Sequence, residues 1–298
     1  MNLEELRALP KVALGVQIGE SIDASDLKRQ LNLLAEQNVA YAECEITLDQ
    51  YELVSSIADE SPVRIGLILK VKDDVDLQEY LEGLAAKRFP LILGVQIRGK
   101  NADNQAPVLR THLITFAIDD IPSFLAVLHG AHRIVDANDM CDDFIFSEEE
   151  NDLVPGPASA FARDRGLPLA YRISKDYSEE SPMALLQSMG FKAFMYSNDP
   201  TGSLSAIVDE HGFDLEDVVA FNRSMVEACW LPLPEREQLL QVVSQPLASL
   251  ADPQELGDEQ PQLDPQYELS QDDLDNIDPE LFTMLGIDPS QIKLTDEK

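Results

Sequence analysis

The sequence predicts an α/β fold built on a parallel sheet, and three observations support this prediction. Eight short apolar runs of strand length alternate with segments of helical periodicity. Runs such as LILGVQI at residues 91–97 are apolar on both faces, as expected for strands that are covered on both sides. The 298 residues, of which 44% are hydrophobic, suffice for one large barrel or two ordinary domains. Right-handed crossovers fit a closed barrel and an open doubly wound sheet alike, so periodicity leaves both alternatives open.

Each element follows from the spacing of its apolar residues. Residues 12–18 are a continuous apolar run and predict the first strand, and Leu27, Leu31 and Leu34 predict a helix over 26–37. The same criterion predicts the other strands at 40–46, 64–71, 91–97, 113–118, 133–136, 169–173 and 193–196. It predicts further helices at 51–59, 75–87, 122–129, 158–165, 183–189, 203–211, 214–228 and 234–243.

The composition changes at Pro246, which we take as a domain boundary between residues 1–245 and 246–298. The second segment holds 14 acidic and 2 basic residues, a net charge of −12, together with six prolines. Such a segment buries too little apolar surface to offset its ordering entropy, so we expect an acidic, largely disordered tail. Within it, the apolar residues of 279–287 predict one short helix that docks on a partner or on the barrel.

Charge and cysteine content exclude several classes of partner. The formal net charge is −33, which repels nucleic acid phosphates and anionic membranes. The three cysteines are scattered and lack C-x-x-C spacing, so neither a disulfide framework nor a zinc knuckle is expected. No secretory signal pattern and no membrane-spanning apolar run is found, and we therefore expect a cytoplasmic protein.

A series of segments in the chain resembles the adenosine deaminase family of the metal-dependent hydrolase superfamily. They are LPKVALGVQI at 9–18, AYAECEI at 40–46, LGVQIRG at 93–99, TFAID at 115–119, RIVDA at 133–137, SNDP at 197–200, and the closing segment 212–235. The resemblance spans residue 9 to about 245, and it implies a (β/α)8 TIM barrel with the site at the carboxyl ends of the strands.

The resemblance also implies a zinc site whose imidazole ligands are replaced in this chain. The matching positions are Gly15 and Gln17 for the first-strand histidines, Phe116 for the fifth-strand histidine, Asp119 for the proton-shuttling glutamate, Asp136 for the sixth-strand histidine, Asn198 for the metal aspartate, and Asp199 beside it. Zinc sites of this kind depend chiefly on imidazole. We therefore predict a degenerate site with no metal, no cofactor and no assignable catalytic residue.

The connection between the first two predicted strands is shorter than the substrate-covering segment that the family has there. About 20 residues, 19–39, join the first two strands, whereas the family places a longer helical insert there. A shortened lid predicts an open pocket, and catalysis in water-excluded sites depends on closure. The chain's four histidines are expected to be structural or surface residues and not ligands: His112, His129, His132 and His211.

These expectations together point to a pseudoenzyme. We expect an interaction or scaffold protein that contacts an unknown protein partner through its acidic tail. One alternative is a sensor that binds a purine-like small molecule without turnover. The other is a divergent hydrolase or deaminase acting on a purine nucleoside or related amine, either metal-free or with a hard cation held by Asp119, Asp136 and Asp199.

Overall fold

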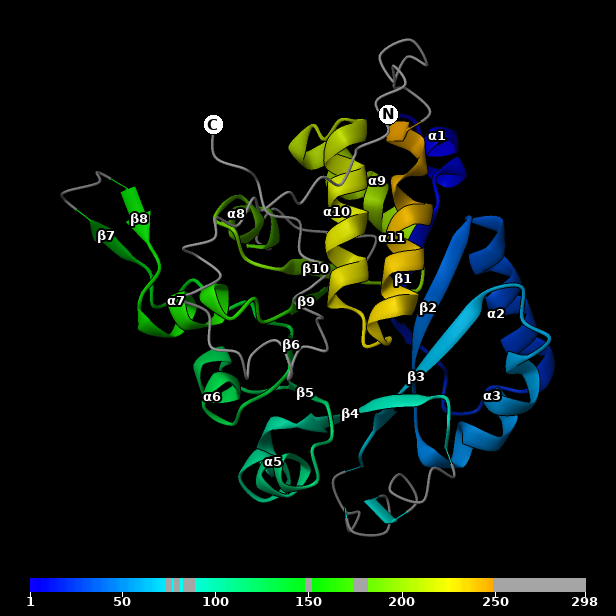
Figure 1. The fold of residues 1–298 in the computed structure, drawn as a ribbon, viewed down its shortest axis with the longest axis horizontal. Helices are drawn as coiled ribbons and strands as arrows, with labels where there is room; N and C mark the ends of the chain where they lie inside the picture. Colours follow the sequence, from blue (N-terminus) through cyan, green and yellow to red (C-terminus); the bar gives the residue numbers. More distant parts are fainter. Residues whose placement is uncertain (73–76, 78–80, 83–88, 148–151, 174–181, 249–298) are drawn as a thin grey trace, which may run out of the picture. The chain divides into compact units, whose positions relative to one another are not determined.

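The computed structural model describes residues 1–72, 77, 81–82, 89–147, 152–173 and 182–248, and its centre is a closed parallel barrel (Figure 1). The strand order around the barrel is β1-β10-β9-β6-β5-β4-β3-β2, which confirms the (β/α)8 barrel and rejects the open sheet. The barrel strands are β1 (Lys11–Gln17), β2 (Val39–Ile46), β3 (Arg64–Lys70), β4 (Ile92–Arg98), β5 (Phe116–Asp119), β6 (Arg133–Val135), β9 (Leu169–Arg172) and β10 (Ala193–Tyr196).

Helices connect and follow these strands. They are α1 (Leu3–Ala8), α2 (Ala24–Glu36), α3 (Tyr51–Ala58), α5 (Ala102–Thr111), α6 (Ser123–Leu128), α7 (Pro157–Asp164), α8 (Met183–Ser188), α9 (Pro200–His211), α10 (Leu215–Ala228) and α11 (Leu233–Ala248). A small antiparallel hairpin, β7 (Ile145–Ser147) with β8 (Asp152–Val154), lies outside the barrel. Figure 1 shows this hairpin projecting beside α7.

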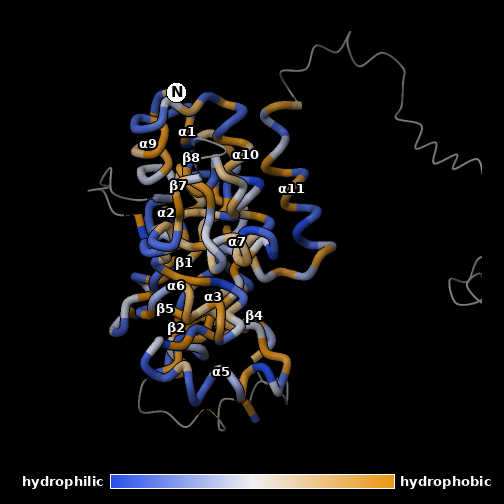
Figure 2. The backbone as a smooth tube through the Cα atoms, turned by 90° about the vertical axis from the view of Figure 1, so that its left-hand side faces the viewer, coloured by the Kyte–Doolittle hydropathy of each residue, from blue (hydrophilic) through white to orange (hydrophobic). Residues whose placement is uncertain are grey.

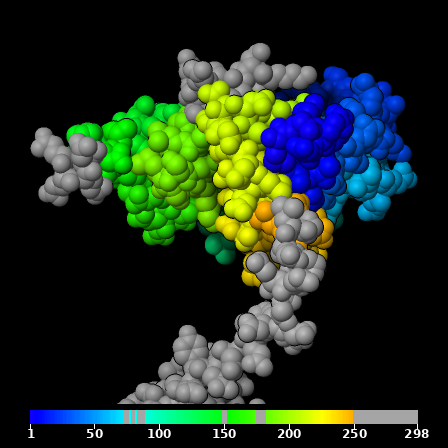
Figure 3. All heavy atoms as spheres, turned by 90° about the horizontal axis from the view of Figure 1, so that it is seen from above, coloured from blue at the N-terminus to red at the C-terminus, as the bar shows by residue number. Residues whose placement is uncertain are grey.

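Helices α2 and α3 cover the outer face of β1, β2 and β3 (Figure 1). Leu27, Leu31 and Leu34, the expected stripe of α2, are buried in this layer. In Figure 2 the barrel strands are largely hydrophobic, while many of the peripheral loops are hydrophilic. Helix α1 packs against α9, and the two are neighbours when the molecule is seen from above (Figure 3).

Most elements begin and end near their expected bounds, and the differences have local causes. Residues 113–118 predict the fifth strand, but β5 begins only at Phe116 because Leu113 closes α5 with a φ of +54° and is 92% exposed. Helix α11 continues to Ala248, beyond the composition change at Pro246. The tail segment 249–298, its predicted helix at 279–287 and most of the helix expected at 75–87 lie outside the described residues.

The amino-terminal half of the barrel interior is filled by a buried ion pair. Arg133 Nη1 lies 2.7 Å from Glu43 Oε2, and both side chains are fully buried. The guanidinium also donates to the Tyr196 hydroxyl at 2.8 Å and stacks 4.3 Å above the Trp230 ring. The backbone N–H of Trp230 donates to Glu43 Oε1 at 2.6 Å, so both carboxylate oxygens of Glu43 have a partner.

The connection from β1 to β2 contains α2 as its only helix, as the short spacing predicts. Cys44, Cys141 and Cys229 are unpaired thiols. Among the described residues, no helix combines the length and apolar character needed to cross a bilayer.

Candidate ligand site at the carboxyl end of the barrel

Polar side chains gather where the barrel strands end. They are Gln17 on β1, Glu45 on β2, Lys70 on β3, Gln96 and Arg98 on β4, Asp119 on β5, Asp136 after β6, Arg172 on β9, and Asn198 after β10. Parallel strands of a barrel end on the same side, where barrel enzymes place their sites. Most other buried residues of the barrel strands are apolar, apart from Lys11 on β1 and the Glu43–Arg133 pair.

Glu45 is the centre of a charged cluster at this end. Its side chain is 1% exposed, and Arg172 Nη2 lies 3.1 Å from Oε1 while Lys70 Nζ lies 3.3 Å from Oε2. Arg172 also reaches Asp136 through a 3.3 Å Nε–Oδ2 contact. A buried carboxylate is costly unless it is paired, and here two cations compensate its charge. We call Glu45, Lys70, Arg172 and Asp136 the ion-pair cluster.

Gln96 and Asp119 form a second pair on the neighbouring strands β4 and β5. Gln96 Nε2 donates to Asp119 Oδ2 at 2.7 Å, and Gln96 is 2% exposed. Within the described part of the chain, Gln96 Oε1 and Asp119 Oδ1 are buried acceptors without a hydrogen-bond partner. Burial raises the pKa of the Asp119 carboxyl, while the Gln96 hydrogen bond opposes that shift.

The position of the first missing histidine has no room for a side chain. Gly15 adopts a φ of +65°, and a Cβ there would collide with the ring of Tyr196. Tyr196 is itself held by Arg133 below and lies 5.4 Å from the Arg172 guanidinium above. An imidazole at position 15 would therefore require the aromatic ring to move.

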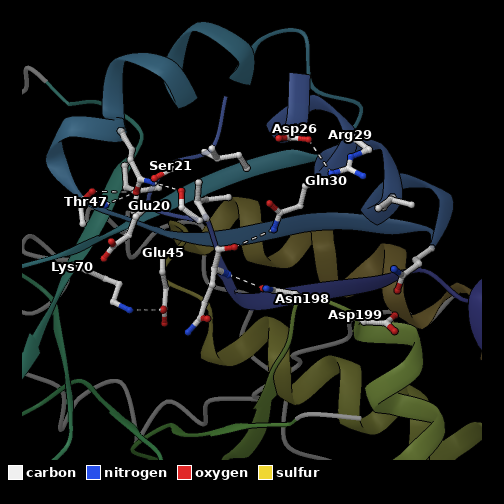
Figure 4. A pocket seen from close by; sticks show the side chains of 18 of the residues that line it. Glu20, Ser21, Asp26, Arg29, Gln30, Glu45, Thr47, Lys70, Asn198 and Asp199 are labelled. Carbon is white, nitrogen blue, oxygen red and sulfur yellow. Dashed lines mark hydrogen bonds and ion pairs between the residues drawn. The ribbon is translucent and has the colours of Figure 1, made fainter. Parts of the chain in front are cut away.

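The other positions matched to the family have structural partners. Asn198 Oδ1 accepts a 2.7 Å hydrogen bond from the backbone N–H of Gln17, and Gln30 Nε2 donates to the Gln17 carbonyl at 3.1 Å (Figure 4). Asp199 caps α9 by accepting from the Gly202 N–H at 3.1 Å. These contacts close the seam between β1 and β10, and they occupy the Asn198 oxygen.

Phe116 does not belong to this site, contrary to the expected alignment. It is the first residue of β5, at the strand's amino end, and its ring packs edge-on against His132 at a centroid distance of 5.3 Å. His132 Nδ1 accepts from the Phe116 N–H at 3.3 Å. The structure therefore brings Gln17, Asp119, Asp136 and Asn198 to one end and leaves Phe116 out.

Two open cavities meet over this end. One, of about 1210 Å³, lies toward α2, and the other, of about 1060 Å³, lies over β3 to β6. Four residues line both: Gln17, Glu20, Thr47 and Lys70. Figure 4 shows Lys70 and Glu45 facing each other beneath the first cavity. The second contains the Gln96–Asp119 pair.

The residues at this end do not fit the zinc that the resemblance implies. In the described part of the chain, no three histidine, cysteine, aspartate or glutamate side chains are grouped to hold a metal ion. The nearest buried carboxylate, Glu45, already faces two cations, and Gln17 and Asn198 are neutral amides. Zinc sites need imidazole, thiolate or free carboxylate. The present donor set therefore does not suit zinc.

The resemblance to the adenosine deaminase family did not identify several residues of this site, although the sequence contains a signal for them. Glu45, Lys70, Gln96, Arg98 and Arg172 stand at or near the ends of apolar runs, where side chains of a buried strand would otherwise be apolar. The alternation of Glu43 and Glu45 in AECEI also predicts two carboxylates on one face. Their pairing with residues of β6 and β9 has no such signal.

The fold is similar to that of solved deaminase-like amidohydrolases. An amidohydrolase with bound zinc from Burkholderia ambifaria superposes with a TM-score of 0.64 and 15% identity, over 84% of this chain and 94% of that one. The N6-methyl-AMP deaminase of Arabidopsis thaliana gives 0.58 and 13%, over 85% and 100%. Adenine deaminase from Arthrobacter aurescens gives 0.59 and 11%, over 76% and 79%.

No protein-family model and no curated protein sequence matches the chain. At these identities the structural likeness shows a shared fold. The chain is a (β/α)8 barrel whose fold is similar to that of deaminase-like amidohydrolases.

Proposed function

We propose that this protein is a deaminase-like barrel that binds a small purine-like molecule at its carboxyl end without metal-dependent hydrolysis. The observation that carries the proposal is the ion-pair cluster around Glu45. A metal-assisted deamination needs a cation that lowers the pKa of bound water. Two cationic side chains, Lys70 and Arg172, already face the buried Glu45 carboxylate and repel a further cation from this place.

The cavities support a binding role. Together they expose amide, carboxylate and cationic groups to one open mouth, which suits a polar ligand with both donors and acceptors. Structures of the same fold have been solved with IMP and with GMP, and such nucleotides are the natural first ligands to try. The interaction role that the acidic tail predicts remains part of this proposal.

Metal analysis and activity measurements test the proposal together. Full-length protein purified without chelator should contain far less than one zinc per chain, and it should not deaminate adenosine, adenine or N6-methyl-AMP. IMP or GMP should nevertheless raise its melting temperature in proportion to occupancy. Stoichiometric zinc together with turnover of any of the three substrates would refute the proposal.

A variant that carries the family's metal ligands tests whether the missing ligands alone prevent zinc binding. Substituting histidine at positions 15 and 17 and aspartate at 198 supplies ligand atoms, but Tyr196 and the ion-pair cluster still oppose the metal. We expect such a variant to gain little zinc and no rate.

One observation favours a second candidate function, a metal-free hydrolase. Asp119 has a pKa raised by burial and one oxygen without a partner among the described residues, which suits a general acid. Turnover by metal-free protein that is lost in Asp119→Asn but kept in Asp120→Asn would favour this candidate over pure binding.

A further inference from the structure

The β7–β8 hairpin presents apolar side chains to solvent. Ile145 is 59% exposed, Phe146 is 61% exposed and Leu153 is 46% exposed. Phe146 and Leu153 are directly opposite each other on the two strands, so their side chains lie on the same face of the hairpin. Exposed apolar side chains gathered on one element are typical of an interaction surface, because their burial is favourable. The hairpin is therefore a candidate for contact with another protein.

The base of the hairpin is attached to the rest of the molecule on both sides. Asp143 accepts hydrogen bonds from the backbone N–H groups of Ala158 at 2.9 Å and Ser159 at 3.1 Å, at the start of α7. Phe144, directly before β7, stacks on Phe191 with the ring centroids 6.1 Å apart. Figure 1 shows the two strands leaving this base and projecting beside α7. The attachment fixes where the strands begin, while their apolar side chains remain accessible.

The outer edge of β7 has the geometry to accept a further strand. Within the described residues, β7 and β8 pair only with each other. Each strand of such a sheet has an outer edge of backbone N–H and C=O groups, and a two-stranded hairpin is by itself only marginally stable in water. On β8 the Leu153 N–H already donates to the Asp152 carboxylate at 2.7 Å. Ile145 and Phe146 on β7 therefore mark the edge at which a third strand can pair.

The charge around the hairpin restricts the chemistry of the partner. Between Arg133 and Arg163 the sequence holds eight acidic residues and no lysine or arginine. Asp142, before β7, and Asp152, at the start of β8, are exposed. A second copy of this chain would bring two such acidic segments together, and the whole chain has 55 acidic residues against 22 basic ones. The charge therefore favours a basic partner over self-association.

We propose that the outer edge of β7 binds an extended segment of a partner protein in which basic residues alternate with apolar residues. The backbone of this segment pairs with β7 and extends the hairpin to three strands. Successive side chains of a strand point to opposite faces, so the apolar ones cover the face of Phe146 and Leu153. The basic ones then lie on the face of Asp152. The described residues of the hairpin do not line the two cavities at the carboxyl end, so this surface is separate from the proposed ligand site.

Synthetic peptides test the proposal on the full-length protein. The probe is a short fluorescein-labelled peptide of alternating lysine and valine, measured at about 0.15 M salt. One control peptide has glutamate in place of every lysine. The other keeps every lysine and has proline in place of the central valine, because proline lacks the N–H that strand pairing needs.

Fluorescence anisotropy gives the three dissociation constants. We expect that of the lysine–valine peptide to be at least about tenfold below those of both controls. Equal affinity for the lysine–valine peptide and its proline variant would mean unspecific charge attraction and would overturn the proposal.

Phe146→Ser tests whether the peptide binds at the hairpin. It should weaken binding of the lysine–valine peptide about fivefold or more, because the apolar contact is lost. Leu233→Ser is the matched control, since Leu233 on α11 is also 59% exposed, and it should leave the affinity unchanged. Circular dichroism and a thermal melt establish that both variants are folded. Equal affinities of the two variants for the peptide would contradict the assignment to β7.

Backbone hydrogen exchange and sedimentation distinguish the possible occupants of this edge. Exchange should slow at residues 145–146 when the lysine–valine peptide is added, and unchanged exchange there would reject strand pairing. Sedimentation of the full-length protein should show a monomer. A dimer that dissociates on substitution of Phe146 would overturn the proposal, because a second copy would then occupy the edge.

Discussion

The ring of Tyr196 fills the space that a side chain at Gly15 would occupy, and this contact joins the two halves of the barrel interior. The Tyr196 hydroxyl accepts from Arg133 in the buried amino-terminal half, and its ring lies beside Arg172 at the carboxyl end. Gly15 permits the approach because it lacks a Cβ and adopts a positive φ. The absence of a histidine here is therefore part of a packed arrangement.

Gly15→Ala should destabilise the barrel. The substitution places a methyl group against the Tyr196 ring and forces a non-glycine residue to a φ of +65°, which together should cost about 2 kcal/mol or more of unfolding free energy. Urea denaturation followed by circular dichroism measures the loss. Gly19→Ala is the control, since no atom lies within 4 Å of a Cβ there and its φ is not in the left-handed region. Equal stability of the two variants would contradict this account.

The buried Glu43–Arg133 ion pair should contribute far more to the free energy of unfolding than an exposed ion pair does. Glu43→Gln leaves the Arg133 guanidinium without its counter-charge in a fully buried position, and we expect a loss of about 3–5 kcal/mol of unfolding free energy. Glu4→Gln removes one member of the exposed Arg7–Glu4 pair and should change stability by less than about 1 kcal/mol. Both values come from denaturant titrations at neutral pH. A loss at Glu43 no larger than that at Glu4 would show that water reaches the barrel interior.

The eight barrel strands could be predicted from sequence because burial on both faces leaves apolar runs, as in residues 12–16 of β1, whereas the exposed β7–β8 hairpin has no such run and was not predicted. Two helices were not predicted from the sequence, each because its helical pattern is weak. Helix α1 is one short capped segment with a single buried residue, Leu6, and α5 contains Pro107, which weakens its helical pattern. These signals are local and weak, whereas closure of the barrel depends on pairing of β1 with β10, which periodicity does not reveal.

The site was predicted less well, since its chemistry depends on contacts between distant strands. The alignment found Asp119 and Asp136, but Glu45 and Arg172 are separated by 127 positions in the chain and meet only in the closed barrel. Phe116 was misplaced because β5 begins at this residue, so its side chain lies at the amino end of the strand and not at the carboxyl end. No sequence pattern predicts that the Tyr196 ring lies against Gly15 and excludes a histidine there.

Asp119→Asn should stabilise the protein at neutral pH. Burial raises the pKa of Asp119 above its usual 3.8, so the folded protein keeps that proton to a higher pH than the unfolded chain. Stability is thus lost as pH rises through the window from 3.8 to the raised pKa, and it stays reduced above that window. Asparagine avoids the charge and keeps a hydrogen bond from Gln96.

Thermal melts of both proteins across this pH range check the sign. The melting temperature of Asp119→Asn should exceed that of the parent near pH 7, and the difference should shrink as the pH falls through the window. Asp120→Asn is the control for the loss of one negative charge, because Asp120 is the next residue and is exposed and paired with Arg98. A parent protein that is relatively more stable at neutral pH would mean that attraction from Lys70 and Arg172 outweighs burial.

Removing the tail should leave the barrel folded. The last described helix, α11, buries Leu239 and Val243 and ends at Ala248, so a chain that stops after residue 248 keeps these contacts. The segment 249–298 has a net charge of −12 out of the chain's −33, and its removal lowers the net negative charge and the repulsion that accompanies it. We expect the truncated protein to retain its melting temperature within a few degrees and its affinity for IMP.

A second truncation after residue 238 is the informative contrast, because it deletes Leu239 and Val243 and should lower the melting temperature markedly. If the first truncation alone unfolds the barrel, the tail is a structural element, and the boundary near residue 246 is wrong.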